Sequence, residues 1–270
     1  MRWVISVLIW LAASIQVESA PDQGVKADAM PLPSGPLVSS EGPKSGRWTA
    51  VCTYPGAESE QALEAKRQEV FKQMSLADPE VAKQLASNPA ATRPKPRIQK
   101  LTVSKSGEIK QEIVEYSSGQ KSERWITPTA TVQWDPFLGR YLFPSIGPAP
   151  KEEDFPEFGW ISATSYKGIK RINDRQCIIF ESRVDKLAVE NPREFKLVGE
   201  QDRMPEMIDA MAAIDIETRF PVTLRIGDQL REYAFLPLAT PNLAMPPAFA
   251  VELQKVKEKI QSSLPRPSRP

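Results

Sequence analysis

Carboxylates and thiols are the side chains of this sequence with the potential for chemistry, because the chain contains no histidine. Its absence excludes Ser-His-Asp and Cys-His catalysis and histidine-ligated zinc or haem. Two acidic groups remain: the run Glu152-Glu153-Asp154, and the pair Asp215 and Glu217, whose spacing places them on one side of a predicted strand. Glycoside hydrolysis needs two carboxyl groups that face each other across a cleft. Proximity in sequence does not supply that geometry, so solvated loop charge is the favoured interpretation and no catalytic residue is predicted.

Cys52 and Cys177 are the two cysteines of the chain, both on strand-like segments. A disulfide between them would close a loop of about 126 residues and stabilise the fold by at most ~5 kcal/mol on the chain-entropy model. The alternative is two separate buried thiols, which pack as small apolar groups. The disulfide interpretation predicts that the two strands lie near each other. Two thiolates are too few for a structural zinc site, so no metal and no cofactor are predicted.

Aromatic side chains crowd one stretch of the chain. They are Trp125, Trp134, Phe137, Tyr141, Phe143, Phe155, Phe158 and Trp160. Aromatic residues favour strands and bury large areas, so they predict a sheet core. The other interpretation is a concave apolar wall that holds acyl chains or stacks on sugar rings. Trp125, Trp134, Phe143 and Trp160 are the candidate ligand-binding residues of this stretch.

Methionines form a second apolar stripe. Met204, Met207 and Met211 stand at positions i, i+3 and i+7 of a helix predicted over Pro205–Ala213. Unbranched, polarizable methionines suit surfaces that accept variable apolar ligands. Packing of a helix on a sheet explains the same spacing. Met207 and Met211 join the candidate ligand-binding residues.

The elements that must position these groups are mostly short antiparallel strands. Alternation with a period of two, punctuated by turn residues, predicts strands at 47–54, 98–104, 108–116, 121–126, 130–134, 140–143, 160–166, 169–172, 175–184, 214–218, 222–226 and 229–236. Apolar residues at helical spacing predict helices at 58–75, 78–85 and 249–264, beside the methionine helix. The sequence therefore predicts an α+β, β-rich fold: a strongly curved antiparallel sheet or unclosed β-barrel with helices packed on it.

The ends of the chain have a different composition. Residues 1–19 read as an export signal peptide, with Arg2 before an apolar run of about 11 residues. That run is shorter than the ~20 residues a membrane span needs, so no integral span is expected in the mature chain. A Pro/Gly-rich flexible leader over 20–46, a single β-rich domain over 47–264 and a disordered tail over 265–270 complete the predicted organisation. The net charge of +1 argues against a nucleic-acid partner.

The second half of the body resembles a known family. The pattern consists of Tyr166-Lys167-Gly168, Arg175–Phe180, Ile214–Leu224, the turn Gly227-Asp228, Tyr233-Ala234-Phe235 and Pro246-Pro247-Ala248-Phe249. In this order it resembles exported proteins of the LolA/LolB-like superfamily, over roughly residues 98–250. The resemblance implies an unclosed β-barrel whose apolar hollow receives acyl chains of lipoproteins or other lipids. The chain departs from the carriers in its Pro-rich leader, its helical insertion at 57–88 and its basic C-terminal helix.

Three functional hypotheses follow. The first is an exported, periplasmic or extracellular, non-enzymatic protein that binds a lipid or lipoprotein acyl chain in a curved-sheet cavity. The alternative is an interaction or scaffold module of the cell envelope that has the same fold, a filled core and a protein partner. The third is a hydrolase based on the carboxylates named above.

Overall fold

The computed structural model describes residues 31–55, 57–77, 96–147, 152–190, 192, 204–238 and 243–263. The chain divides into two units, residues 1–30 and 31–270, and the fold described below is that of the second. The predicted signal peptide, the predicted helix at 78–85 and the C-terminal tail lie outside the described residues. No helix in the described ranges has both the length and the apolarity to cross a membrane.

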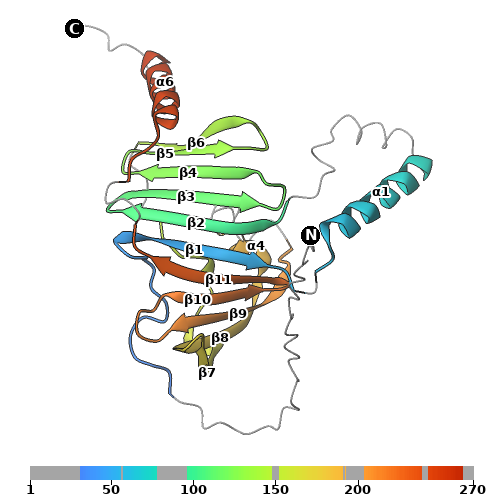
Figure 1. Cartoon of the computed structure of the whole chain (residues 1–270), viewed down its shortest axis with the longest axis vertical. Coiled ribbons are helices and arrows are strands. Elements are labelled where there is room, and N and C mark those ends of the chain that lie inside the picture. Colours follow the sequence, from blue (N-terminus) through green and yellow to red (C-terminus); the bar gives the residue numbers. More distant parts are fainter. Residues whose placement is uncertain are drawn as a thin grey trace, which may run out of the picture. The chain divides into compact units, whose positions relative to one another are not determined.

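The architecture is a single antiparallel sheet of eleven strands, accompanied by helices (Figure 1). The strands are β1 (Ser45–Thr53), β2 (Ile98–Ser106), β3 (Ile109–Tyr116), β4 (Lys121–Thr127), β5 (Ala130–Asp135), β6 (Arg140–Ile146), β7 (Tyr166–Ile172), β8 (Arg175–Asp185), β9 (Met207–Asp215), β10 (Pro221–Ile226) and β11 (Gln229–Leu236). The helices are α1 (Glu60–Ala77), the 3-10 turns η1 (Pro156–Phe158) and η2 (Ala163–Ser165), α4 (Lys186–Glu190) and α6 (Pro247–Ser263).

Two meanders meet at the centre of the sheet. The strand order is β6-β5-β4-β3-β2-β1-β11-β10-β9-β8-β7. Neighbouring strands are joined by tight turns at several points, for example at Gly107 and Gly227, whose φ values of 59° and 54° suit glycine. The pairing of β1 with β11 joins the two ends of the domain. The predicted β-rich fold with an antiparallel sheet is confirmed. The sheet is open but not strongly curled, which corrects the expected strong curvature.

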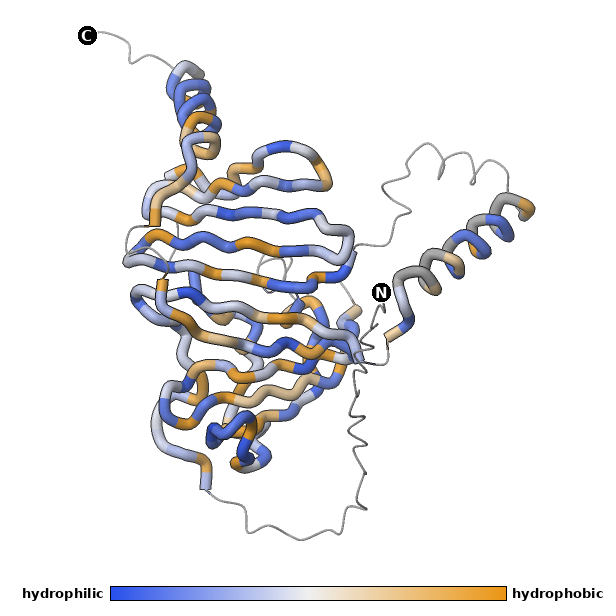
Figure 2. The backbone as a smooth tube through the Cα atoms, viewed as in Figure 1, coloured by the Kyte–Doolittle hydropathy of each residue, from blue (hydrophilic) through white to orange (hydrophobic). Residues whose placement is uncertain are grey.

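Register divides the sheet into two faces. We call face A the face that carries Trp48, Ala50 and Cys52 of β1, which alternate with more exposed residues. Face B is the opposite face. Trp125 lies on face B, because it pairs through β3 and β2 with Arg47, the neighbour of Trp48. The alternation of polar and apolar residues along these strands is visible in Figure 2.

The largest core cluster lies on face A of β1, β11, β10, β9 and β8. The segment 155–160, which includes η1, packs its aromatic rings on this face: the ring centroids of Trp48 and Phe155 are 5.5 Å apart, and those of Phe158 and Tyr233 are 5.7 Å apart. Val189 of α4 is fully buried in the same cluster. Side chains of the connecting segments therefore fill much of face A.

Face B carries two smaller clusters. Phe249 and Leu253 of α6 pack on Trp125, Ala130 and Val132 of β4 and β5. The second cluster comprises Cys177, Ile179, Ala213 and Val222 on β8 to β10. The C-terminal helix predicted from its apolar spacing is thus present. Phe249 and Leu253 of the expected apolar face are buried, whereas Ile260 is 42% exposed.

The end of the predicted leader belongs to the fold. Ser40 accepts a backbone hydrogen bond from Asp154, and Ser39 donates one to the carbonyl oxygen of Arg219, both 2.9 Å long. Leu37 and Val38 pack against the face A core. Residues 31–46 therefore differ from the flexible leader that composition predicts, because a few apolar side chains and backbone bonds anchor them to the domain.

Element predictions differ from the structure in three places. The strand predicted over 214–218 stops at Asp215, where β9 ends. The methionine helix predicted over Pro205–Ala213 is strand β9, paired on both sides with β8 and β10. Residues 160–165, predicted as part of a strand, form a turn and η2 before β7 begins at Tyr166. At β9 the hydrogen bonds available in the sheet outweigh local propensity.

Candidate functional site

A cavity of about 190 Å³ lies on face A, between the centre of the sheet and the segments that cover it. β1, β2, β3 and β11 form its floor. Residues 154–157 and the end of α4 form its roof. Its lining comprises Trp48, Ala50, Cys52, Ile98, Leu101, Val103, Glu112, Val114, Asp154, Pro156, Glu157, Val189, Glu190, Pro192 and Arg231.

The apolar part of the cavity comes from three neighbouring strands. Ala50 pairs with Leu101 of β2, and Leu101 pairs with Val114 of β3, so the three side chains form one row across the floor. Trp48 and Val103 form the next row and are 1% and 3% exposed. This row arrangement follows from strand alternation and produces a continuous apolar wall.

The polar end of the cavity contains the buried side chains of Arg231 and Glu157, each of which makes a hydrogen bond. Arg231 of β11 lies beside Cys52 of β1, and its Nε donates a 2.7 Å hydrogen bond to Oε1 of Gln229. Tyr233 donates its hydroxyl to Oε1 of Glu157 over 2.9 Å. Burial and the Glu157 carboxylate raise the pKa of Tyr233 well above its usual value. Burial favours the neutral form of Arg231, but Tyr233 and Glu157 outweigh it and raise its pKa. The charged form of Arg231 is therefore favoured, and the Glu157 carboxylate contributes to this through space.

The thiol of Cys52 and the carboxyl group of Glu190 also line this space. Burial raises the pKa of the Cys52 thiol, although Arg231 opposes the shift, so the thiol is protonated at neutral pH. Burial likewise raises the pKa of the Glu190 carboxyl at the end of α4, against the influence of Lys186 and Arg231. A neutral thiol is a poor nucleophile, and the cavity offers no histidine to activate it.

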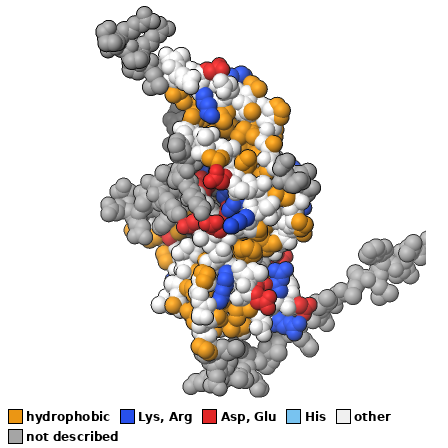
Figure 3. Space-filling view, turned by 90° about the vertical axis from the view of Figure 1, so that its left-hand side faces the viewer, with side chains coloured by type: hydrophobic (Ala, Val, Ile, Leu, Met, Phe, Trp, Pro, Cys, Tyr) orange, Lys and Arg blue, Asp and Glu red, His pale blue; other side chains and the backbone are white. Residues whose placement is uncertain are grey.

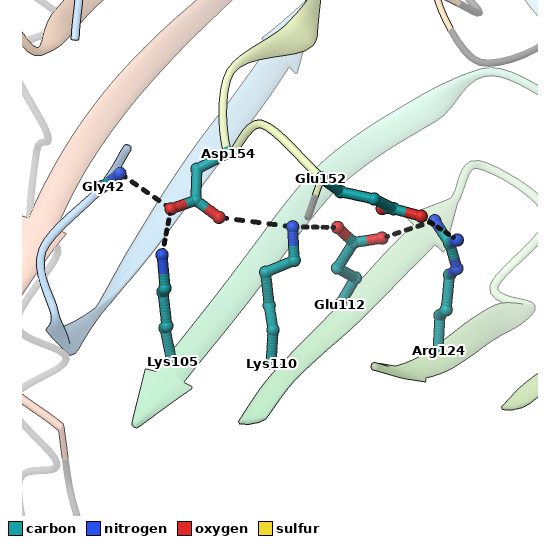
Figure 4. Close-up of polar contacts among 7 residues, drawn as sticks. All are labelled: Gly42, Lys105, Lys110, Glu112, Arg124, Glu152 and Asp154. Carbon is teal, nitrogen blue, oxygen red and sulfur yellow. Dashed lines mark hydrogen bonds and ion pairs between the residues drawn. The ribbon is translucent and has the colours of Figure 1, made fainter. Parts of the chain in front are cut away.

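An ion-pair network runs along face A beside the cavity (Figure 4). Oδ2 of Asp154 accepts hydrogen bonds from the backbone N–H of Gly42, at 2.8 Å, and from Lys105. Its Oδ1 lies 3.2 Å from the ammonium of Lys110. Lys110 also lies 3.3 Å from Glu112, which faces Arg124 at 3.5 Å.

The network ends at the loop before η1, where Arg124 donates a 2.8 Å hydrogen bond to Glu152. It contains three cations and three carboxylates, so its charges balance. Lys105 and Lys110 are cross-strand partners on one face, an arrangement that repels. Asp154 lies against both ammonium groups and relieves this repulsion. The network therefore attaches the roof of the cavity to β2, β3 and β4.

The aromatic candidates separate into two groups. Trp125, Trp134 and Phe143 belong to the cluster covered by α6 on face B. Trp134 packs against Tyr141 in a tilted arrangement, with ring centroids 5.1 Å apart, and Tyr141 packs edge-on against Phe249. Trp160 packs at the margin of the face A core instead. The four side chains are therefore not brought together into one site, and none of them lines the cavity.

The methionine candidates lie elsewhere again. Met207 and Met211 project from face B of β9, four residues apart, and Met207 is 43% exposed. They border a shallow surface depression with charged residues of β8, β9 and β10. Figure 3 shows hydrophobic and charged side chains interspersed on one side of the molecule.

Cys52 and Cys177 are both free and buried, so the predicted disulfide is wrong. β11, β10 and β9 lie between β1 and β8. The four strand-to-strand spacings of about 4.8 Å place the two strands roughly 19 Å apart. A disulfide holds its Cα atoms within about 7 Å. The two thiols also point to opposite faces, since Cys52 lies on face A and Cys177 belongs to a face B cluster. The alternative interpretation, two separate buried thiols, holds.

The carboxylates have local structural partners. Oδ1 of Asp215 accepts two 2.9 Å hydrogen bonds, from the backbone N–H groups of Glu217 and Thr218. β9 ends at Asp215, so Glu217 lies in the following turn and the expected shared strand face is absent. Glu152 and Asp154 are neutralised in the ion-pair network. Their interpretation as solvated loop charge needs correction, because Asp154 is buried.

Sequence reasoning missed the polar residues of the cavity. Gln229, Arg231 and Tyr233 alternate along β11 and occupy its buried positions. Polar side chains at every second position of a strand are the signal that could have indicated this site. Glu157 sits beside Phe158 in a short aromatic segment and carries no such signal. Its burial arises from the folding of η1 onto the sheet.

Comparison with solved structures gives a distant likeness. No protein-family model matches the chain, and no curated protein matches it. Among solved structures, the chain is similar to the one titled "Crystal structure of LprF from Mycobacterium bovis". The two share 10% identity with a TM-score of 0.34, over 75% of this chain and 90% of that one. The match is thus a distant structural likeness to mycobacterial LprF, and at this TM-score it carries no argument about family or function.

Proposed function

We propose that this protein binds a small apolar or amphiphilic molecule in the face A cavity and carries out no catalysis. The observation that supports this function is the cavity itself, which has an apolar floor and a buried polar end. Ligand sites commonly combine apolar walls with a few placed polar groups. A thiol held neutral by burial and carboxylates held in ion pairs are poorly suited to acid–base or nucleophilic work.

The size of the cavity limits the ligand. At about 190 Å³ it is smaller than the roughly 300–1,000 Å³ typical of ligand pockets. It fits a short alkyl chain or part of a longer acyl chain. Each buried methylene contributes about 0.8 kcal/mol, so about ten methylenes would supply the roughly 8 kcal/mol of micromolar affinity. A lipid or a lipoprotein acyl chain is the ligand class we propose.

The place of action that we propose is outside the cytosol. This part of the proposal rests on residues 1–19, whose positive start, short apolar run and small residues are typical of an export signal. A periplasmic or extracellular carrier of an apolar molecule fits such a location.

A second candidate function is supported by a different observation. Phe155, Phe158 and their neighbours occupy much of face A, as expected for an envelope interaction module with a filled core. In that case a protein partner takes the place of a lipid.

Lipid analysis and a fluorescent probe test the proposal together. The intact protein, purified from its native host, is extracted with organic solvent for mass spectrometry, and the stripped protein is titrated with N-phenyl-1-naphthylamine. Val114→Phe fills the cavity from its floor. Ile113→Phe is the matched control, because Ile113 is the adjacent, half-buried residue on face B.

We expect co-purified lipid and probe binding in the parent and in Ile113→Phe, and at least a tenfold loss of both in Val114→Phe. Absence of lipid and of probe binding in the parent refutes the function. Crosslinking in cells that then traps one reproducible protein partner favours the second candidate.

A further inference from the structure

The polar groups around the cavity are unevenly charged. Four acidic residues and one basic residue line it: Glu112, Asp154, Glu157, Glu190 and Arg231. The ion-pair network neutralises two of the acids, because Asp154 contacts two lysines and Glu112 contacts a lysine and an arginine. The charges that remain for a ligand are those of Glu157, Glu190 and Arg231.

Arg231 is already engaged on several sides. Its Nε donates to Gln229, and Tyr233 and Glu157 favour its charged form. A ligand anion would have to share this one cation with Glu157. It would also enter a buried space in which like charges repel strongly, because little water screens them.

Glu157 offers the complementary opportunity. It is 8% exposed and accepts one hydrogen bond, from the Tyr233 hydroxyl. An ionised carboxylate has about four acceptor positions, so Glu157 retains acceptor capacity at the wall of the cavity. Glu190 adds a second carboxyl at the α4 end. Donor groups on a ligand would satisfy these acceptors, and a positive charge would relieve the excess of acids.

We propose, on the basis of the proposed function, that the ligand of this cavity carries a neutral or cationic head group that donates hydrogen bonds, such as a primary alcohol or an alkylammonium. The apolar chain lies on the floor formed by Ala50, Leu101 and Val114, and the head group donates to Glu157. Amphiphiles with a carboxylate or phosphate head are rejected.

Isothermal titration calorimetry with three matched ten-carbon probes tests the proposal. Decanol, decylamine and decanoate share one chain and differ in head group, and at pH 7.4 the amine is a cation and the acid an anion. All three are used below the concentrations at which they form micelles, on the intact mature protein. We expect decylamine and decanol to bind at least about tenfold more tightly than decanoate.

Glu157→Gln tests the assignment of the head-group site. The amide keeps the size of the side chain and an oxygen for Tyr233, but it removes the carboxylate charge that favours the charged form of Arg231. We expect the preference to invert, with decanoate binding more tightly than decylamine. Glu181→Gln is the control, because Glu181 is an exposed carboxylate of β8 outside the cavity lining, and it should keep the parent preference. If Glu157→Gln does not fold, Glu190→Gln replaces it, with an expected reduction of the amine preference by about threefold or more.

The outcomes distinguish failure of the proposed function from failure of the head-group inference. Binding of none of the probes overturns the proposed function. Binding with decanoate equal to or tighter than decylamine overturns the head-group inference and leaves the proposed function standing. The expected preference without any change in the folded variants overturns the role assigned to these carboxylates.

Discussion

Asp154 joins three separate segments of the domain, so its replacement by asparagine tests the structural reasoning directly. Its side chain is 2% exposed, and its partners Lys105 and Lys110 are 15% and 7% exposed. The amide oxygen of Asn can still accept the backbone N–H of Gly42. Both ion pairs are lost, however, and two neighbouring ammonium groups then face each other without a counter-charge.

The magnitude follows from this geometry. Removing one partner of a buried ion pair costs about 3–5 kcal/mol, because a charge is left uncompensated. Lys110 keeps Glu112 at 3.3 Å, and Lys105 retains some access to water, so we expect the lower end, about 3 kcal/mol. With a urea m-value of about 2 kcal/mol per molar, the midpoint of unfolding should fall by roughly 1.5 M.

Urea titration followed by circular dichroism at pH 7 measures the change. Asp174→Asn is the matched control, because its ion pair with Arg171 is 94% exposed on the acid side, and it should alter stability by less than about 0.5 kcal/mol. If Asp154→Asn proves as stable as this control, the network does not hold the roof of the cavity on the sheet, and our reading of it is wrong.

Three further predictions concern other parts of the molecule. Tyr233→Phe removes the hydroxyl that donates to Glu157 and should cost about 1.5–3 kcal/mol at pH 7. Because burial raises the pKa of Tyr233 above its usual 10.0, the parent loses stability as the pH rises above about 10, and urea titrations at pH 9 and pH 11 should show a smaller decline in the variant. Phe249→Ala removes the ring that packs α6 on face B and should cost about 3 kcal/mol and expose α6 to limited proteolysis; unchanged cleavage of α6 would contradict this packing. Alkylation of the unfolded protein without reductant should modify both Cys52 and Cys177, as intact mass will show, and the native protein should react far more slowly at both buried thiols; a product that requires reductant would restore the disulfide.

Much of the fold is local and was predictable. Alternation and turn residues predict most strands of the two meanders, because an antiparallel hairpin is specified by neighbouring residues and a tight turn. Asn173-Asp174, for example, adopts φ values of 48° and 63° between β7 and β8, as a two-residue hairpin turn requires. The apolar spacing of Phe249 and Leu253 predicts the helix that packs on β4 and β5.

The predictions that proved wrong concern segments whose local sequence pattern is compatible with two structures. Met207 and Met211 suit a helix, but the alternation of Ala210, Ala212 and Ile214 suits a buried strand equally well. The sheet decides between them, since β8 and β10 supply hydrogen-bond partners on both sides. Likewise, strand alternation indicates that Cys52 and Cys177 are buried. It does not indicate which face of the sheet each thiol lies on.

By itself, the sequence determined which reactive side chains this protein has: no imidazole, two thiols, and acidic and basic groups in balance. It also determined the short strands that pair with their neighbours. Only the tertiary structure decided which residues meet. The pairing of β1 with β11 brings Cys52 beside Arg231, and the folding of η1 onto face A brings Glu157 to the same place. These contacts join residues far apart in the chain, and such long-range pairing depends on the whole sheet rather than on any local pattern.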